Sequence, residues 1–262
     1  MTGSSKTPVA LITGAGRGIG ADIAETLAAT GYAVAVTDLD LQAAEGVAHR
    51  LGGEAVGLHM NVRSAESVER TAQKVRALGP LKAIVNNAGV NRTGPTATLP
   101  AELWDLVVDT NLGGTFRVSQ AFGPLMFGAG GAIVNIGSMY SQTSAPGRAA
   151  YTASKHGIVG LTRCLAVEWG ARGVRVNAVL PGWLSTQMFD EQVRLGGIDL
   201  PYLMGRIPAG ALGSGSQIAE MIRFLVSDSA SYVTGQAIAV DGGYLANGAP
   251  AAARSHDLPV DT

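Results

Sequence analysis

The chain has 262 residues, of which 47% are hydrophobic and 15% are charged, and its formal net charge is −1. A chain of this length can bury one large core, and its near-neutral charge argues against binding to nucleic acid or to an anionic membrane. No run reaches the roughly 18 apolar residues of a membrane span, and the short polar start, residues 1–8, does not resemble a secretory signal. Since the single Cys164 cannot form an internal disulfide, we expect a cytoplasmic protein.

Strand-length apolar runs alternate with helical patterns along the chain. The expected strands are residues 9–13, 33–37, 55–60, 83–86, 132–136, 174–179 and 237–240. The expected helices are a segment with Ile19, Ile23 and Leu27 on one face, followed by residues 64–78, 101–127, 150–170 and 216–226. Such alternation predicts βαβ units, and continuous apolar strands predict a parallel sheet covered on both faces. We therefore expect an α/β fold with a doubly wound sheet in a single domain, residues 1–262.

Two segments depart from this alternation. Residues 183–215 form a long stretch of mixed composition, interrupted by Pro201 and Pro208. Loops of this length in a compact domain are often functional, so we interpret it as a substrate lid, with an irregular connection as the alternative. The tail, residues 247–262, carries two prolines and an alanine run, and we expect it to be flexible or to lie against a neighbouring subunit.

The first expected strand leads into a glycine-rich turn at residues 13–20, where a helix begins. Glycines there allow the backbone to approach a pyrophosphate, which the N–H groups and partial positive charge of the helix N-terminus can bind. Two spacings fit: Gly16-x-Gly18-x-x-Ala21, which is the ordinary dinucleotide pattern, and Gly14-x-x-x-Gly18-x-Gly20. Either spacing between a strand and a helix predicts a dinucleotide site.

The second expected strand is followed by Asp38. An acidic residue at this point accepts hydrogen bonds from the ribose hydroxyls of NAD and repels the 2′-phosphate of NADP. Its neighbour is Leu39, which cannot bind such a phosphate, whereas Arg17 in the glycine turn is a residue that favours one. We predict NAD over NADP. The alternative role for Asp38 is an N-cap for a helix beginning near Leu41.

Tyr151 and Lys155 lie at positions i and i+4 of an expected helix and therefore share a face. A nearby ammonium stabilises a phenolate, so we expect Lys155 to lower the pKa of Tyr151 toward working pH and make it a general acid/base. Ser138 ends the fifth expected strand. Because the carboxyl ends of parallel strands form the ligand crevice, we expect Ser138 to face the same cavity as the glycine turn.

These motifs together resemble those of the classical short-chain dehydrogenase/reductase family, from about Pro8 to Leu245. The resemblance rests on the ordered occurrence of the residue 13–20 turn, Asn86-Asn87-Ala88-Gly89, Asn111, Ser138, Tyr151 with Lys155, Pro181-Gly182 and Val240-Asp241-Gly242-Gly243. It implies a Rossmann-like sheet of seven parallel strands and NAD(P)-dependent oxidation of an alcohol or reduction of a carbonyl.

The resemblance also implies roles for four catalytic residues. Tyr151 transfers the proton, Ser138 hydrogen-bonds the substrate oxygen, and Lys155 binds the nicotinamide ribose and lowers the tyrosine pKa. Asn111 holds a water molecule that links Lys155 to solvent, although an Asn within a helix can simply bond to nearby backbone. The chemistry is consistent, because the cofactor carries the hydride while the protein orients and polarises the substrate.

A larger set is expected to bind the dinucleotide. Asn61 stands where the family often has an aspartate that contacts the adenine, and Thr186 matches a position that contacts the nicotinamide amide or a phosphate. For Asn87, stabilisation of the sheet is an equally good interpretation, and residues 241–243 are expected to form a structural turn. The expected cofactor residues are Gly14, Arg17, Gly18, Ile19, Gly20, Asp38, Asn61, Val62, Asn87, Ala88, Gly89, Tyr151, Lys155, Pro181, Gly182 and Thr186.

Other functions fit the sequence less well. The four histidines are scattered without the spacing of a metal site, so no metal is expected. Enoyl reductases of the same superfamily place their tyrosine seven residues before the lysine, where this chain has Arg148. A catalytically silent dinucleotide sensor or scaffold remains an alternative, although it has no need of all four catalytic residues.

The substrate is expected to be a small molecule that binds between the segment at residues 138–148 and the lid. Trp183, Met188, Phe189, Tyr202 and Met204 are candidate lid contacts, with packing of the lid against the domain as the alternative. Our hypothesis is a secondary alcohol of the polyol or sugar type, and 3-oxoacyl thioesters and cyclic or aryl ketones remain alternatives. In the family the helices expected at residues 101–127 and 150–170 form a subunit interface, so we expect a homotetramer, with a homodimer second.

Overall fold

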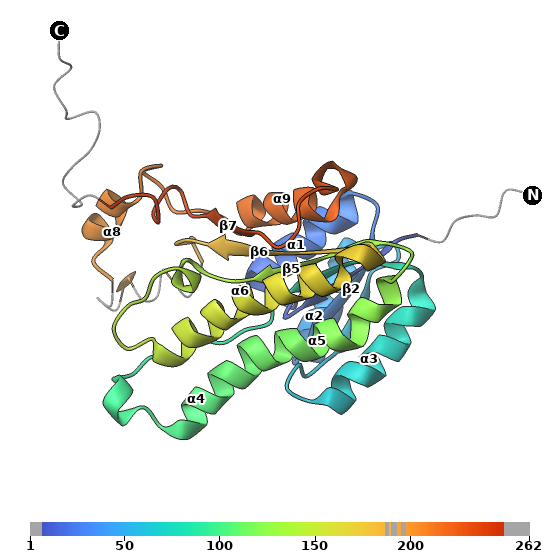
Figure 1. Ribbon diagram of the computed structural model, residues 1–262, viewed down its shortest axis with the longest axis horizontal. Coiled ribbons are helices and arrows are strands. Elements are labelled where there is room, and N and C mark those ends of the chain that lie inside the picture. Colours follow the sequence, from blue (N-terminus) through green and yellow to red (C-terminus); the bar gives the residue numbers. More distant parts are fainter. Residues whose placement is uncertain (1–6, 187–188, 190–192, 195–197, 249–262) are drawn as a thin grey trace, which may run out of the picture.

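The computed structural model describes residues 7–186, 189, 193–194 and 198–248, and a seven-stranded parallel sheet lies at its centre (Figure 1). The strands follow the order β3-β2-β1-β4-β5-β6-β7, as expected for a Rossmann-like α/β fold. Their bounds are β1 Val9–Thr13, β2 Ala33–Asp38, β3 Val56–His59, β4 Leu81–Asn86, β5 Gly131–Ile136, β6 Val174–Pro181 and β7 Ala237–Val240. The predicted α/β fold is confirmed.

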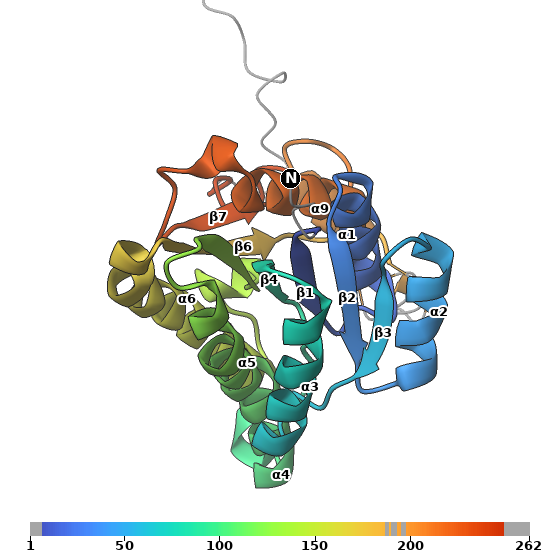
Figure 2. The ribbon, with the colours of Figure 1, turned by 90° about the vertical axis from the view of Figure 1, so that its right-hand side faces the viewer.

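Helices cover both faces of this sheet (Figure 2). One layer contains α1 Gly18–Ala29, α2 Leu41–Leu51 and α9 Gly215–Val226, and the other contains α3 Ala65–Leu78, α4 Ala101–Val108, α5 Gly114–Phe122 and α6 Ala149–Trp169. Successive side chains of a strand point to opposite faces. In β1, therefore, Ala10 and Ile12 pack with the first layer, and Val9 and Leu11 with the second, all fully buried.

The order of the strands reverses direction between β1 and β4. The chain moves from β1 to β2 and β3 on one side of the sheet, then returns to place β4 on the other side of β1. A crevice opens at the carboxyl ends of strands at such a point, and ligands of open α/β sheets bind there. The glycine turn after β1 and Asn87 after β4 both lie at this edge.

The segment expected to be one helix, residues 101–127, is interrupted. Helix α4 ends at Val108, a π-helical turn covers Asp109–Gly113, and α5 ends at Phe122, before a 3₁₀ turn at Gly123–Met126. A π-turn inserts an extra residue while both flanking pieces keep their helical spacing, so the apolar pattern does not reveal it. The interruption matters because Asn111 lies inside it.

The expected lid is described only in part. Helix α8, Leu200–Arg206, lies within it, and Asp199 accepts the N–H of Tyr202 as its N-cap. Phe189, Leu203 and Ile207 form a separate small apolar cluster with partly buried neighbours that include Trp183 and Met204. This favours packing within the segment for several expected lid contacts. Tyr202 is exposed, and Met188 and most of the expected tail lie outside the described residues.

Candidate active site

The glycine turn after β1 leaves the N-terminus of α1 open. Gly14 and Gly18 have φ angles of +61° and +56°, which favour glycine, and this supports the wider of the two spacings. A Cβ on Gly20 would lie 2.4 Å from the carbonyl oxygen of Gly14, whereas one on Gly18 would meet nothing within 4 Å. The N-cap, Arg17, makes no capping side-chain bond, and the first turn of α1 contains no acidic side chain. The uncapped N–H groups fit an anion such as a pyrophosphate.

Asp38 lies beside this turn at the end of β2. Its Oδ2 accepts the backbone N–H of Gly16 at 2.9 Å, and its Oδ1 accepts that of Asp40 at 3.1 Å. The alternative role as the N-cap of α2 is wrong, because the helix begins at Leu41 and Asp40 caps it by accepting the N–H of Ala43 at 3.1 Å. Asp38 therefore joins the second strand to the glycine turn.

Asn87 holds the glycine turn from the other side of the crevice. Its Nδ2 donates to the carbonyl oxygens of Thr13 at 2.9 Å and Gly14 at 2.8 Å. The hydroxyl of Thr13 accepts the N–H groups of Asn87 at 3.0 Å and Ala88 at 2.9 Å. These contacts across 73 to 75 residues of sequence favour the structural interpretation of Asn87.

Helix α6 and the end of β5 position the expected catalytic residues. The Nζ of Lys155 donates to the carbonyl oxygen of Ile136 at 2.6 Å and lies 5.5 Å from the ring centroid of Tyr151. Ser138 follows β5, and its N–H donates to the hydroxyl of Ser141 at 3.2 Å. That hydroxyl donates in turn to the carbonyl oxygen of Lys155 at 2.8 Å, which ties the Ser138 segment to α6.

Burial dominates the electrostatics of this pair. It raises the pKa of Tyr151, while a hydrogen bond with Ser138 and then the charge of Arg148 act in the opposite direction and Tyr140 adds to the rise. Burial also lowers the pKa of Lys155 to about 8. The expected lowering of the tyrosine pKa by Lys155 is therefore wrong for the structure described. Removal of the phenolate from water raises the pKa of Tyr151 by more than Ser138 and Arg148 lower it.

Asn111 is completely buried in the π-turn and connects three segments. Its Oδ1 accepts the N–H of Val90 at 2.8 Å, and its Nδ2 donates to the carbonyl oxygen of Val90 at 3.0 Å and to the hydroxyl of Ser154 at 3.1 Å. The side chain thus bonds to backbone, as the alternative had it, although to a residue 21 positions away. Asn111 joins the segment after β4 to the residue beside Lys155, and its expected water remains a prediction.

The end of β6 contributes mainly backbone. The N–H of Gly182 donates to the carbonyl oxygen of Val240 at 3.0 Å, and a Cβ on Gly182 would lie 2.6 Å from the Cα of Asp241. The carboxylate of Asp241 accepts the N–H groups of Gly243 at 2.9 Å and Leu245 at 2.8 Å, so the expected structural turn is confirmed. The hydroxyl of Thr186 accepts the N–H of Phe189 at 3.2 Å.

Comparison with known proteins agrees with this geometry. A family model described as enoyl-(acyl carrier protein) reductase matches residues 14–245. The chain is 38% identical over 240 residues to the 3-oxoacyl-[acyl-carrier-protein] reductase FabG of Escherichia coli, covering 90% of this chain and 96% of the relative. It is 40% identical over 241 residues to a D-threitol dehydrogenase of Mycolicibacterium smegmatis, covering 90% and 92%.

A solved structure extends the likeness to three dimensions. A gluconate 5-dehydrogenase from Burkholderia cenocepacia, in complex with NADP and tartrate, matches with a TM-score of 0.87 and 31% identity, over 92% of this chain and 96% of that one. The chain belongs to the classical short-chain dehydrogenase/reductase family. It is an oxidoreductase of this family, whose members bind a nicotinamide dinucleotide.

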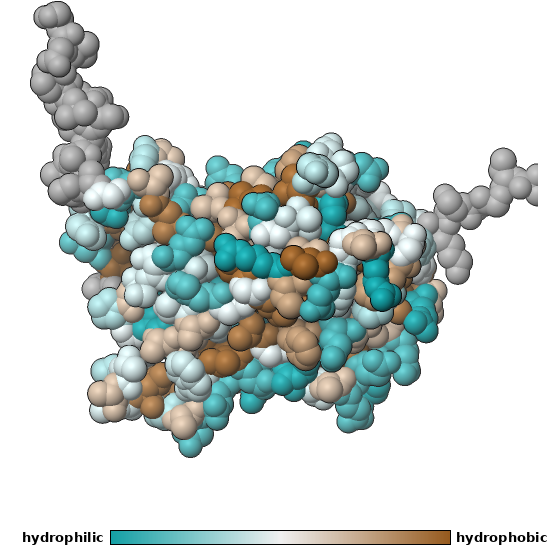
Figure 3. Space-filling model, viewed as in Figure 1, coloured by the Kyte–Doolittle hydropathy of each residue, from teal (hydrophilic) through white to brown (hydrophobic). Residues whose placement is uncertain are grey.

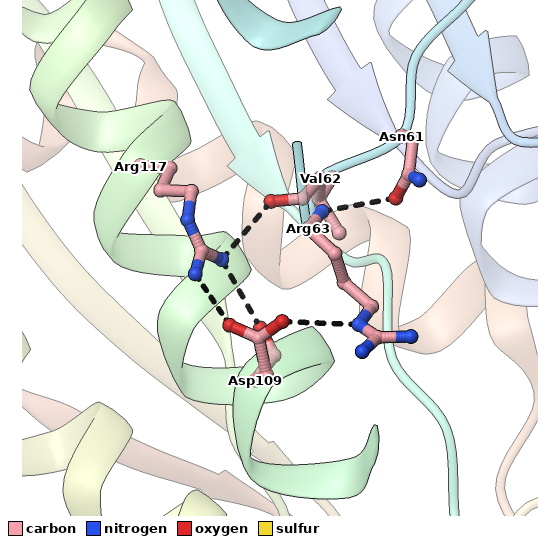
Figure 4. A network of polar contacts seen from close by, with 5 residues as sticks. All are labelled: Asn61, Val62, Arg63, Asp109 and Arg117. Atoms are coloured by element: carbon pink, nitrogen blue, oxygen red, sulfur yellow. Dashed lines mark hydrogen bonds and ion pairs between the residues drawn. The ribbon is translucent and has the colours of Figure 1, made fainter. Parts of the chain in front are cut away.

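In this member of the family, an ion-pair network that sequence reasoning missed surrounds Asp109, two residues before Asn111 in the π-turn (Figure 4). Asp109 accepts from Arg63 Nε at 3.0 Å and from the guanidinium of Arg117. Arg117 also contacts the carbonyl oxygen of Val62 at 3.4 Å, and the side chain of Asn61 accepts the N–H of Arg63 at 3.0 Å. Burial acts to raise the pKa of Asp109, but the hydrogen bonds and charges of the two guanidinium groups hold it below its usual value.

This network ties the expected adenine-side loop to the π-turn. A Cβ on Gly114 would lie 2.7 Å from the Cγ2 of Val62, so the close approach of loop and helix requires glycine there. Nothing in the sequence pairs residues 63, 109 and 117, because the contacts depend on the packing of three separate segments. Within the described part of the chain, no group of three or more His, Cys, Asp or Glu residues could hold a metal ion, and no helix has the length and apolar character needed to cross a membrane.

Proposed function

We propose that the protein interconverts a secondary alcohol and its ketone with NAD, acting on a polyol, a sugar or a related hydroxy compound. The observation that carries this proposal is the convergence of Ser138, Tyr151 and Lys155 at one end of the sheet, with Asn111 linked to the same helix through Ser154. A dinucleotide sensor has no use for this proton-transfer arrangement. When bound, the nicotinamide supplies or accepts the hydride.

Each of the three residues has a distinct task in this proposal. The hydroxyl of Ser138, already within hydrogen-bonding reach of Tyr151, holds the substrate oxygen. The phenol of Tyr151 gives a proton to that oxygen during reduction and takes it back during oxidation. The ammonium of Lys155, anchored by the carbonyl oxygen of Ile136, provides positive charge next to the phenol.

The preference for NAD rests on Asp38. Its carboxylate lies against the glycine turn, where it would accept ribose hydroxyls and repel a 2′-phosphate. The next residue, Leu39, is exposed and uncharged, whereas Arg17 in the glycine turn is a basic side chain that would favour the 2′-phosphate of NADP. We propose that the dinucleotide contacts Gly14, Arg17, Gly18, Ile19, Gly20, Asp38, Asn61, Val62, Asn87, Ala88, Gly89, Tyr151, Lys155, Pro181, Gly182 and Thr186.

Initial rates of NAD⁺ reduction over a panel of polyols, sugars, hydroxy acids and cyclic or aryl alcohols test the proposal. We expect turnover on polyols, sugars or hydroxy acids, and its loss in a Tyr151→Phe variant that still binds the dinucleotide. Turnover that survives in the variant would overturn the assignment of the proton-transfer residue. Dinucleotide binding with no turnover on any substrate would favour a sensor.

Reduction of 3-oxoacyl thioesters is the second candidate. It is supported by 38% identity to FabG, a named 3-oxoacyl-[acyl-carrier-protein] reductase. The discriminating measurement is the reduction of acetoacetyl thioesters in the same assay, with the reduced dinucleotide. We do not propose enoyl reduction, because Arg148 stands seven residues before Lys155.

We further propose a homotetramer in the cytoplasm. Trp104, Phe116 and Val167 on α4, α5 and α6 are 40%, 46% and 85% exposed, and Figure 3 shows hydrophobic surface over this region. Where α4 joins α5 through the π-turn, the surface has an open hollow of about 550 Å³, lined by Arg63, Asp105, Val108, Asp109, Leu112, Gly113 and Phe116. A hollowed face with large exposed apolar side chains supports contact with another subunit. The cytoplasmic location rests on the single Cys164.

A further inference from the structure

Arg148 ends the segment expected to face the substrate and lies near the catalytic tyrosine, on whose pKa its charge acts, but no chemical role has been assigned to its side chain. It directly precedes α6 and stands one helical turn before Tyr151, so the two residues lie on the same side of the helix. Its guanidinium carbon is 5.3 Å from the ring centroid of Tyr140. The rings of Tyr140 and Tyr151 meet edge to face, with their centroids 6.3 Å apart. Arg148, Tyr140 and Tyr151 therefore form one wall of the site.

The positive charge of this wall is not neutralised. Arg148 is half-buried, and within the part of the chain that the structure describes it makes no ion pair with a carboxylate. The groups that act on the pKa values of the two tyrosines are Arg148, Ser138, Tyr244 and the tyrosines themselves, with no acidic side chain among them. The ammonium of Lys155 adds a second cation nearby.

Packing against an aromatic ring explains only part of this arrangement. Such a cation–π contact orients a guanidinium and contributes roughly 0.5–1 kcal/mol at an exposed site. This contact and the hydrogen bond between Arg148 and Tyr140 use only part of the five N–H donors of the guanidinium. A carboxylate matches that planar set of donors with two parallel hydrogen bonds, which a hydroxyl or a thioester carbonyl does not.

We propose that Arg148 is a specificity-determining residue that binds a carboxylate of the substrate, so that the enzyme acts on hydroxy acids and their oxo forms in preference to neutral alcohols. The inference rests on the proposed function, because it takes the reacting oxygen to lie at Ser138 and Tyr151. Three residues of α-helix rise about 4.5 Å. A carboxylate a few bonds from the reacting carbon therefore spans the distance from Tyr151 to Arg148.

Matched acid and neutral substrates test this proposal. Two such pairs are D-gluconate with D-sorbitol and tartrate with threitol. In each pair the acid carries carboxylate where the neutral compound carries hydroxymethyl. We expect the wild type to have at least tenfold higher kcat/KM for the acid, and Arg148→Gln to lower the ratio of acid to neutral kcat/KM about ten- to one hundredfold. Arg148→Lys should retain part of that ratio, because it keeps the positive charge but cannot donate two parallel hydrogen bonds to a carboxylate.

The ratio of acid to neutral kcat/KM distinguishes recognition of the carboxylate from an effect of Arg148 on Tyr151. If Arg148 only adjusted the proton affinity of Tyr151, its replacement would change kcat for the acid and the neutral substrate alike, and the ratio would stay constant. That result would overturn the proposal, as would a wild type that favours the neutral member of each pair. Arg92→Gln is the matched control, since Arg92 is exposed and bonds to the backbone of its neighbour Asn91.

Binding without turnover provides an independent measurement. Titration calorimetry with D-gluconate and with D-sorbitol should give an at least tenfold weaker gluconate affinity in Arg148→Gln than in the wild type. If the wild type and Arg148→Gln bound gluconate with equal affinity, the inference would be overturned even for an active enzyme. Gluconate binding that depends on Arg148, without turnover of any substrate, would instead uphold the carboxylate-binding role of Arg148 and overturn both the proposed function and the preference in turnover.

Discussion

Single residues in the site are held at some cost to the stability of the fold. Lys155 is 4% exposed, and burial lowers its pKa from 10.5 to about 8. Its Nζ donates a hydrogen bond to the carbonyl oxygen of Ile136 at 2.6 Å. A buried ammonium with a single neutral acceptor does not stabilise a protein. Its presence is consistent with selection for chemistry at this position.

We predict that Lys155→Met inactivates the enzyme without lowering its free energy of unfolding at pH 7. Because the folded-state pKa is depressed, the unfolded chain binds more protons between about pH 8 and pH 10.5, and the lysine destabilises the fold fully below pH 8. The depression corresponds to about 3 kcal/mol, against about 1–3 kcal/mol for leaving the oxygen of Ile136 unpaired.

Urea denaturation of both proteins at pH 7 and at about pH 10 measures this effect. The wild type should gain stability relative to the variant as the pH rises, because its lysine loses the unfavourable charge. A stability difference that does not depend on pH would contradict the prediction.

A second prediction at this scale concerns Asp38. Asp38→Asn should raise the ratio of NADP to NAD kcat/KM at least about tenfold, since it removes the negative charge that repels the 2′-phosphate. An amide oxygen retains one acceptor for the N–H of Gly16 or Asp40. Steady-state kinetics with both dinucleotides measure the ratio. Asp40→Asn, an exposed carboxylate that caps α2, is the control and should leave the ratio unchanged.

At the scale of secondary-structure elements, the π-turn between α4 and α5 is the feature that organises the site. It places Asn111 where its amide reaches both Val90 and Ser154. Asp109, two residues earlier, fastens the same turn to Arg63 and Arg117. One turn of chain is thus held at one end by an amide and at the other by an ion-pair network.

We predict that Asp109→Ala lowers kcat and raises KM for the dinucleotide, because the turn and the loop at Asn61 and Val62 are no longer joined. The free energy of unfolding should fall by about 1 kcal/mol at pH 7. Because the pKa of this carboxyl is depressed, the stabilisation is present above its unfolded-state pKa and is lost as the pH falls through the folded-state value.

Denaturation and steady-state kinetics of Asp109→Ala, Asp109→Glu and Glu66→Gln check this prediction. Asp109→Glu should restore part of the activity, because it keeps the charge. Glu66→Gln breaks an exposed pair with Arg70 on α3 and should change neither quantity measurably. Equal effects of Asp109→Ala and Glu66→Gln would show that the network has no positioning role.

The elements show how far sequence reasoning reaches. Strand and helix positions follow from local apolar spacing, so the fold was predictable. The i, i+4 spacing of Tyr151 and Lys155 likewise predicted that both side chains lie close together on one helix face. The ion pair of Asp109 with Arg63 joins residues 46 positions apart, which no local pattern reveals. The π-turn and the packing of Arg148 on Tyr140 are local, but they depend on how these short segments pack in the folded chain. The balance of burial and charge at Tyr151 likewise depends on how completely the folded chain excludes water.

For the whole molecule, the proposed tetramer rests on the exposed apolar side chains on the outer face of α4, α5 and α6. We predict that the wild type forms a tetramer of 26.7 kDa chains at micromolar concentration, and that Phe116→Glu produces smaller species, because a charge replaces an exposed apolar side chain beside the hollow. Light scattering after gel filtration measures the mass. Leu78→Glu, at the end of α3, is the control and should leave it unchanged. A monomeric wild type would contradict the prediction.

The bonds from Asn87 to Thr13 and Gly14 have a consequence for the lifetime of the protein in the cell. They close the glycine turn with residues more than 70 positions away, so the turn is complete only when β1 and β4 have paired. A dinucleotide bound there associates with the folded chain and not with the unfolded one, and it stabilises the fold by mass action. We therefore expect the rate of proteolysis to rise when the supply of the nucleotide falls, which would couple the abundance of the enzyme to the availability of its coenzyme.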